Sequence, residues 1–158
     1  MDTAQELAQL YARDLTRLLQ ELDAFPDETS LWTCLPGIRN SAGNLMLHLE
    51  GNLREYIGRL LGHVAYVRQR DLEFSTGNVA KEELTRRLGE VRELVPQVLS
   101  SLSPEALDAI YPEVVLERSL TTRQYLIHTH GHLTYHLGQI DYLRRIVTGS
   151  GAITLAGL

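Results

Sequence analysis

Four long segments with a helical hydrophobic period constrain the fold of this chain more than any other feature. We expect them at residues 3–24, 40–62, 79–102 and 121–147. Within the first segment, apolar residues recur at intervals of three and four, the spacing of one helix face. They are Leu7, Tyr11, Leu15, Leu18 and Leu22. At about 1.5 Å per residue, segments of this size form helices roughly 35–40 Å long. The pattern therefore predicts an all-α fold, an antiparallel four-helix bundle.

Turn and capping signals separate these segments. The second helix is expected to begin at Asn40 or Ser41, since either residue can cap it. Thr121 followed by Gln124 fits a capping box at the start of the fourth helix. The stretch 63–79 is expected to be a surface excursion, either a lid or a long loop.

Length, charge and cysteine content limit the class of protein. A chain of 158 residues is the size of one ordinary domain, and we expect a single domain over residues 1–158. The net charge is −5, from 15 basic and 20 acidic residues that are mixed along the chain. This pattern argues against nucleic acid as a partner. Cys34 is the only cysteine, which suits a reducing cytoplasm. No run of 18 apolar residues occurs, so we expect a soluble cytoplasmic protein with no membrane partner.

Three histidines of the fourth segment share one spacing. His128, His132 and His136 follow one another at intervals of four, at which two imidazoles on one helix face can bind a single metal ion. His132 and His136 are expected to face the bundle interior, with His128 farther out. Burying an imidazole without a partner costs about 1–3 kcal/mol. Both inward histidines therefore need hydrogen-bond partners or a metal.

His48 is the expected third ligand, because it lies on the inward face of the second segment. Three nitrogens from two helices would leave a fourth metal position open for water or substrate, as in catalytic zinc sites. Leu133 follows His132 where a zincin has glutamate, so zincin-type hydrolysis is not supported. The alternative is a structural role, in which the histidines pair with each other or brace two helices through a metal.

Other polar residues have simpler interpretations. His130 is expected on the solvent-exposed side of the fourth helix. Arg68 and Arg70 are expected on a solvated face, although Arg70 is also a weaker candidate for contacting substrate. Cys34, in a loop without a neighbouring histidine, is interpreted as a small packing residue rather than as a nucleophile.

Two runs of residues resemble the DinB-like superfamily of bacterial helical proteins. They are Asn44-Leu45-Met46-Leu47-His48-Leu49 and His132-Leu133-Thr134-Tyr135-His136-Leu137-Gly138-Gln139-Ile140. Trp32 lies where such proteins often have tryptophan, and the runs 51–52 and 70–74 are similar to an uncharacterised branch. The resemblance covers nearly the whole chain in helix order. It implies an up-up-down-down-like bundle, frequently dimeric, with a divalent metal such as nickel or zinc bound by the residues matching His48, His132 and His136.

The resemblance also implies a chemistry. Relatives include transferases and isomerases that use a low-molecular-weight thiol, so the expected function is metal-dependent transfer to a small-molecule substrate with a small thiol cosubstrate. Asn52 and Gln139 are the candidate substrate-binding residues, since each lies within about a turn of an expected ligand. The family often has histidine and arginine on either side of the last ligand, where this chain has Tyr135 and Leu137. The alternative is a non-enzymatic bundle with an interaction or structural role.

A homodimer is expected through the fourth helix. Gly131, Thr134 and Gly138 form a strip of small residues on a different face from the histidines. Interior glycines cost a helix roughly 0.5–1 kcal/mol each relative to alanine, and close helix approach is one way to offset that cost. Approach of a helix within the same chain is the alternative. The uncharged tail 152–158 is expected to pack on a surface groove or on a second subunit.

Overall fold

The computed structural model describes residues 2–115 and 117–157, and these form a helical fold, as expected. The long helices are α1 (Thr3–Asp23), α3 (Ala42–Leu53), α5 (Lys81–Ser100) and α7 (Thr122–Thr148). A π-helical segment, η1 (Arg54–Arg59), continues α3 directly. Shorter helices lie in the connections: α2 (Glu28–Trp32), α4 (Arg70–Ser75) and α6 (Pro104–Asp108). The four expected long segments are therefore helical, with ends within a few residues of those predicted.

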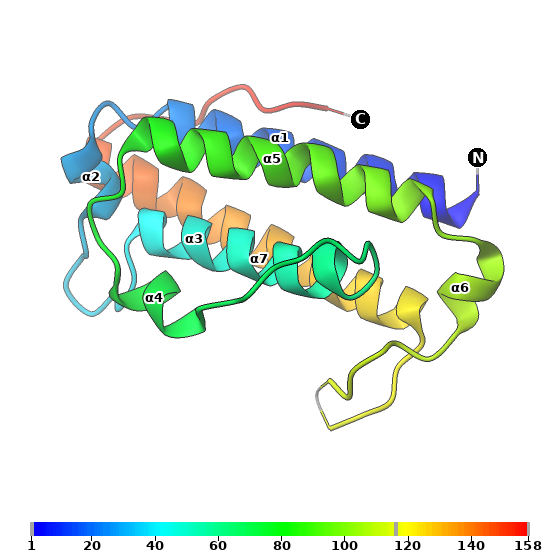
Figure 1. Cartoon of the computed structure of the whole chain (residues 1–158). Coiled ribbons are helices and arrows are strands. Elements are labelled where there is room, and N and C mark those ends of the chain that lie inside the picture. The colour runs from blue at the N-terminus through cyan, green and yellow to red at the C-terminus, as the bar shows by residue number, and fades with distance from the viewer. Residues whose placement is uncertain (1, 116, 158) are drawn as a thin grey trace.

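The long helices pack in a ring. α1 contacts α5 and α7, and α3 contacts the same two helices from the other side. α1 and α7 run in one direction and α3 and α5 in the opposite one, so the order along the chain is up-down-down-up (Figure 1). The up-up-down-down-like order implied by the resemblance is wrong. In both orders, each helix has one parallel neighbour. Local sequence signals do not set the direction in which each helix runs, so they could not distinguish the two orders.

The parallel arrangement of α3 and α5 explains the excursion at 63–79. Because both helices run the same way, the chain must return along the bundle before α5 can begin (Figure 1). The returning segment contains α4, which packs against α3. The stretch expected as a lid or a long loop is therefore a crossover held against the side of the bundle.

Local capping chemistry sets the helix ends. Ser41 is the N-cap of α3, and its hydroxyl oxygen accepts a hydrogen bond from the backbone nitrogen of Asn44. Thr121 and Gln124 form the expected capping box of α7. Gly149 ends that helix in the left-handed conformation, with φ of 69°, which glycine adopts without steric cost. The capping predictions are confirmed.

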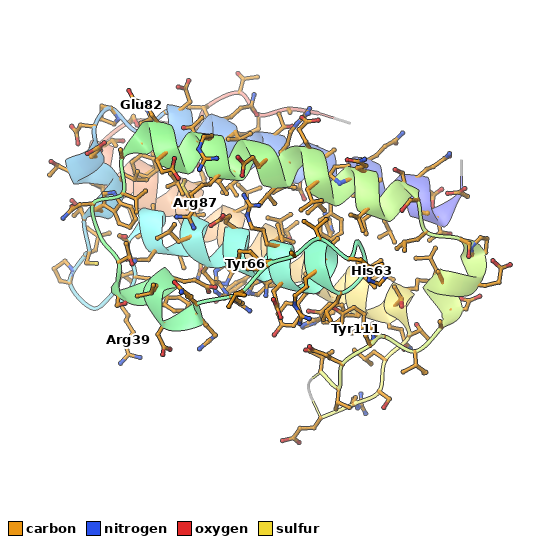
Figure 2. The ribbon with its side chains drawn as sticks, in the orientation of Figure 1. Arg39, His63, Tyr66, Glu82, Arg87 and Tyr111 are labelled. Atoms are coloured by element: carbon orange, nitrogen blue, oxygen red, sulfur yellow. The ribbon has the colours of Figure 1, made fainter. Side chains whose placement is uncertain are left out.

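The core is mainly aliphatic, and several charged side chains are buried beside it. The expected apolar face of α1 is buried throughout. Arg87 extends from α5 toward α3, where its guanidinium pairs with the buried carboxylate of Glu50 (Figure 2). In the C-terminal tail, the carbonyl of Ala156 accepts a hydrogen bond from Arg17 of α1 at 2.7 Å. The described tail therefore packs on α1. None of the helices described here is both long and apolar enough to cross a membrane.

Candidate metal centre

Three histidine side chains converge between α3 and α7. Nε2 of His132 lies 3.1 Å from Nε2 of His48 and 3.1 Å from Nε2 of His136. The three ligand nitrogens all lie within 4.8 Å of one another. Two tetrahedral bonds of about 2.0–2.1 Å to one metal ion would separate their nitrogens by roughly 3.3–3.4 Å. The structure thus brings together all three expected ligands at nearly the spacing of a shared metal ion.

In two of these histidines, a hydrogen bond to one ring nitrogen decides which nitrogen is left with a free lone pair. Nδ1 of His48 lies 2.8 Å from Oε2 of Glu73, and an ionised carboxylate can only accept a hydrogen bond. Nδ1 of His136 lies 2.7 Å from the amide oxygen of Gln139, which is also an acceptor. Both Nδ1 atoms therefore carry the proton. The Nε2 lone pairs of His48 and His136 point toward His132.

His132 cannot satisfy both neighbours as a neutral imidazole. Its Nε2 can donate at most one hydrogen bond, so at least one of the two nitrogen–nitrogen contacts at 3.1 Å is a close, repulsive approach of two electronegative atoms with no hydrogen bond between them. Its Nδ1 is buried and has no hydrogen-bond partner among the described residues. A cation held by the three Nε2 atoms would replace this repulsion with attraction. The residues present therefore fit a divalent metal with three nitrogen ligands.

The electrostatics of the cluster favour neutral ligands. Burial and the neighbouring His136 and His48 lower the pKa of His132 to about 4. Burial likewise lowers the pKa of His136, against the hydrogen bond with Gln139. Metal binding requires the unprotonated ring nitrogen, and at neutral pH both side chains have it.

The crossover contributes two residues that sequence reasoning missed. Glu73 of α4 holds Nδ1 of His48, and both oxygens of its carboxylate accept hydrogen bonds from the Arg68 guanidinium. Burial raises the pKa of Glu73, but the hydrogen bonds from His48 and Arg68 outweigh it and the pKa is lowered. The expectation that Arg68 lies on a solvated face is wrong, because only 11% of its side chain is exposed. Arg70 is exposed as expected.

One signal in the sequence marks this contact. Gly51 is buried in the last turn of α3, which continues directly into η1, and glycine inside a helix often indicates close approach of another group. A Cβ atom at Gly51 would lie 2.2 Å from Oε1 of Glu73. The glycine shows that something approaches, although the sequence does not say what.

The candidate substrate-binding residues have distinct surroundings. Gln139 is half-buried, and its amide oxygen is engaged by His136. Asn52 is half-buried one turn after His48, and its amide oxygen is buried without a partner among the described residues. Cys34 is exposed in the loop before α3 and is not part of the cluster.

His130 is not the solvent-exposed residue expected from its place on α7. Its Nε2 lies 3.0 Å from Oδ2 of Asp14 on α1, and only 17% of its side chain is exposed. The reason is that α1 packs on that side of α7, which the period of α7 alone does not reveal. His128 is exposed and lies outside the metal cluster.

Comparison with known proteins agrees with the architecture. A family described as a protein of unknown function (DUF1572) matches residues 4–156. The chain belongs to this family.

The fold is also that of a solved DinB-like protein. The crystal structure of a DinB-like protein from Bacillus cereus ATCC 10987, at 2.01 Å resolution, has a TM-score of 0.70 to this chain. The likeness covers 96% of this chain and 95% of that one at 16% sequence identity, a level that shows the fold alone. The expected resemblance to DinB-like proteins is confirmed. No curated protein matches the chain.

One open pocket of this DUF1572 member adjoins the histidine cluster, and a second lies beside Phe74. One, of about 500 Å³, is lined by His136 and Gln139 together with a largely apolar wall. That wall includes Leu35, Ile38, Leu45, Tyr135, Tyr142, Leu143 and Ile146. The other, of about 510 Å³, includes Arg39, Arg70 and Phe74, and the Phe74 ring lies 4.9 Å from the ring of His48. Arg39 points away from the body of the molecule (Figure 2).

Proposed function

We propose that this protein binds one divalent metal ion, nickel or zinc, through Nε2 of His48, His132 and His136, and uses it for group transfer with a small thiol cosubstrate. The observation that carries the proposal is the convergence of three imidazole rings on one point through their Nε2 atoms. In two of these rings, the other nitrogen, Nδ1, already has a hydrogen-bond partner. A partly buried cluster of imidazoles has no other evident reason to direct its lone pairs at one point.

The donor set supports a reactive centre rather than a closed structural one. No carboxylate or cysteine of the described chain joins the three histidines as a fourth ligand. Glu73 faces the outer nitrogen of His48, on the side away from Nε2 of His132. Three protein ligands leave a position for an exogenous group. A bound divalent metal would hold a coordinated thiol as its thiolate at neutral pH.

The neighbouring pocket supports a small-molecule substrate. It opens beside His136, and its wall is mostly apolar. Gln139 holds His136 through its amide oxygen, which leaves its amide nitrogen free to donate to a ligand. Asn52 supplies a buried acceptor with no partner in the described chain. We assign both residues to substrate orientation, and the acidic chain favours a small molecule over nucleic acid.

The thiol must come from outside the protein. Cys34 is exposed, and its thiol donates a long hydrogen bond to the backbone oxygen of Arg39, at 3.9 Å. The side chain has no part in the histidine cluster. A free small thiol suits the reducing cytoplasm in which we place this protein.

Metal binding is tested first. Untagged protein should purify with about one nickel or zinc per chain by elemental analysis, and a chelator should lower its melting temperature. The stabilisation at a hundredfold excess of metal over Kd should be about 2.7 kcal/mol. The double variant His48→Ala, His136→Ala should retain no metal, whereas His128→Ala, which changes an exposed histidine of the same helix, should retain it. Equal metal content in the double variant and the wild type would refute the site.

Thiol chemistry is tested on the metal-loaded protein. Calorimetry with bacillithiol, mycothiol and glutathione should detect binding that disappears after metal removal. Conjugation of the bound thiol to an electrophilic test substrate should be lost in His132→Ala and retained in Cys34→Ala. Metal binding without any metal-dependent thiol binding would leave the non-enzymatic, metal-braced bundle as the function.

A further inference from the structure

We propose that Arg68 and Glu73 are positioning residues for the metal, and that the crossover segment 64–76 is thermodynamically coupled to metal binding through them. Glu73 fixes the ring nitrogen that His48 offers, and Arg68 fixes Glu73. The inference rests on the proposed metal site and is independent of the thiol chemistry.

The contact between Glu73 and His48 selects one tautomer. Oε2 of Glu73 lies 2.8 Å from Nδ1 of His48, and the proton must lie on Nδ1 because the carboxylate cannot donate. Nε2 then has its lone pair directed toward Nε2 of His132, 3.1 Å away. A carboxylate on the outer nitrogen of a metal-binding histidine also makes its inner nitrogen a better donor to metal.

Arg68 holds the carboxylate in a single orientation. Its Nε donates to Oε1 of Glu73 at 2.7 Å, and its Nη2 donates to Oε2 at 2.9 Å. Two parallel hydrogen bonds fix the carboxylate plane in a way that one point charge cannot. The pair is largely shielded from solvent, with 11% of the Arg68 side chain and 7% of the Glu73 side chain exposed. Side-chain freedom at Glu73 is correspondingly small.

The backbone of the crossover is also tied to α3. The side-chain amide nitrogen of Asn44 donates to the backbone carbonyls of Glu73 and Thr76, at 3.2 and 2.8 Å. The Glu73 carboxylate sits over Gly51, where a Cβ atom would come within 2.2 Å of Oε1. Phe74 adds a ring contact with His48, at 4.9 Å between centroids. The C-terminal half of α4 is therefore held against the helix that carries the first ligand.

These contacts couple the order of the segment to the metal. A metal ion bound to Nε2 requires the tautomer that Glu73 stabilises, so metal binding favours the docked crossover and the docked crossover favours metal binding. Linkage makes the two effects equal in free energy. Other His48 tautomers and undocked forms of α4 become accessible when the carboxylate is removed.

The test compares two buried carboxylates that each pair with an arginine. Glu73→Gln keeps an acceptor for His48 but loses the charge, and the matched control is Glu21→Gln, whose partner Arg144 lies far along α7 from the histidines. Chelator competition should show zinc affinity weakened about 10–100-fold in Glu73→Gln and unchanged in Glu21→Gln. Arg68→Lys keeps the positive charge but loses the two parallel hydrogen bonds to the carboxylate, so its zinc affinity should lie between those of wild type and Glu73→Gln. Equal affinity in Glu73→Gln and wild type, or equal losses in both glutamine variants, would overturn the proposal.

A second measurement does not depend on affinity. Imidazole ¹⁵N chemical shifts of the metal-free protein should show His48 protonated at Nδ1 in wild type and as a mixture of tautomers in Glu73→Gln. Amide exchange within residues 64–76 should slow about tenfold when zinc is added to wild type, and the slowing should shrink in Glu73→Gln. Unchanged tautomers or zinc-independent exchange would refute the positioning role. If wild type binds no metal, the proposed function fails, while the tautomer measurement still decides whether Glu73 positions His48.

Discussion

The carboxylate of Asp14 joins α1 to α7 through His130, with Oδ2 of Asp14 3.0 Å from Nε2 of the imidazole. Asp14 is fully buried and also accepts hydrogen bonds from Arg13 and Arg17. Burial alone would raise the pKa of Asp14, but the hydrogen bonds from His130 and Arg13 outweigh it and lower the pKa to about 2. The ionised carboxylate is therefore a stabilising element of the α1–α7 interface.

Acid should weaken this interface in a defined range. Because the pKa of Asp14 is lower in the folded than in the unfolded protein, its contribution is complete above about pH 4 and is lost as pH falls toward 2. The folded-state pKa of about 2 corresponds to roughly 2 kcal/mol of stability. Urea unfolding of Asp14→Asn at pH 7 should show a free energy of unfolding lower than that of wild type by about that amount. Between pH 4 and 2, the free energy of unfolding should change less with pH in Asp14→Asn than in wild type. Parallel profiles for the two proteins would contradict the assignment.

For alanine substitutions at Gly131 and Gly138, the expected homodimer and an isolated chain make opposite predictions. Apart from the backbone of its own helix, no atom of the described residues lies within 4 Å of a Cβ atom built on Gly131, Gly138 or Gly89. Alanine should therefore stabilise an isolated chain at each position by about 0.5–1 kcal/mol through helix propensity. If the strip on α7 packs against a second subunit, Gly131→Ala and Gly138→Ala should instead weaken the dimer in sedimentation experiments. Gly89→Ala on α5 is the control, and a monomeric wild type across micromolar concentrations would exclude this dimer.

The hydrogen bond from His136 to Gln139 should support metal affinity. Gln139→Leu removes the acceptor for Nδ1 of His136 and should weaken metal binding about tenfold. Gln139→Glu keeps an acceptor at the same position and should retain the affinity or increase it. Chelator competition measures both, with Gln97→Leu on the exposed face of α5 as control. Similar affinities of the leucine and glutamate variants would argue against this role.

Close packing at Gly51 should make this position intolerant of a methyl group. Gly51→Ala would force the Glu73 carboxylate away from its place above α3. We expect a loss of about 1–3 kcal/mol in the free energy of unfolding, as for other overpacked sites, together with weaker metal binding. Thermal unfolding with and without zinc measures both effects. The open position Gly89 provides the comparison, since alanine there should stabilise the chain, and similar gains at the two glycines would disprove the close contact.

The amino-acid sequence by itself determined the helical segments and the histidine set. Hydrophobic period and capping residues act over one or two turns, so Leu7 to Leu22, Ser41 and Thr121 could be interpreted without knowledge of the fold. The same local geometry put His132 and His136 on one face, four residues apart. His48 followed because the inward face of its own helix could be recognised in the same way.

Only the tertiary structure decided what lies across from those faces. No local signal sets the direction of each helix. The contact of Glu73 with His48 joins residues 25 positions apart, and the pairing of His130 with Asp14 joins residues 116 positions apart. Residue spacing within one helix carries no information on which segment packs against it. The crossover reaches His48 because α3 and α5 are parallel, and that parallel arrangement follows from how the four apolar faces bury one another rather than from any local signal.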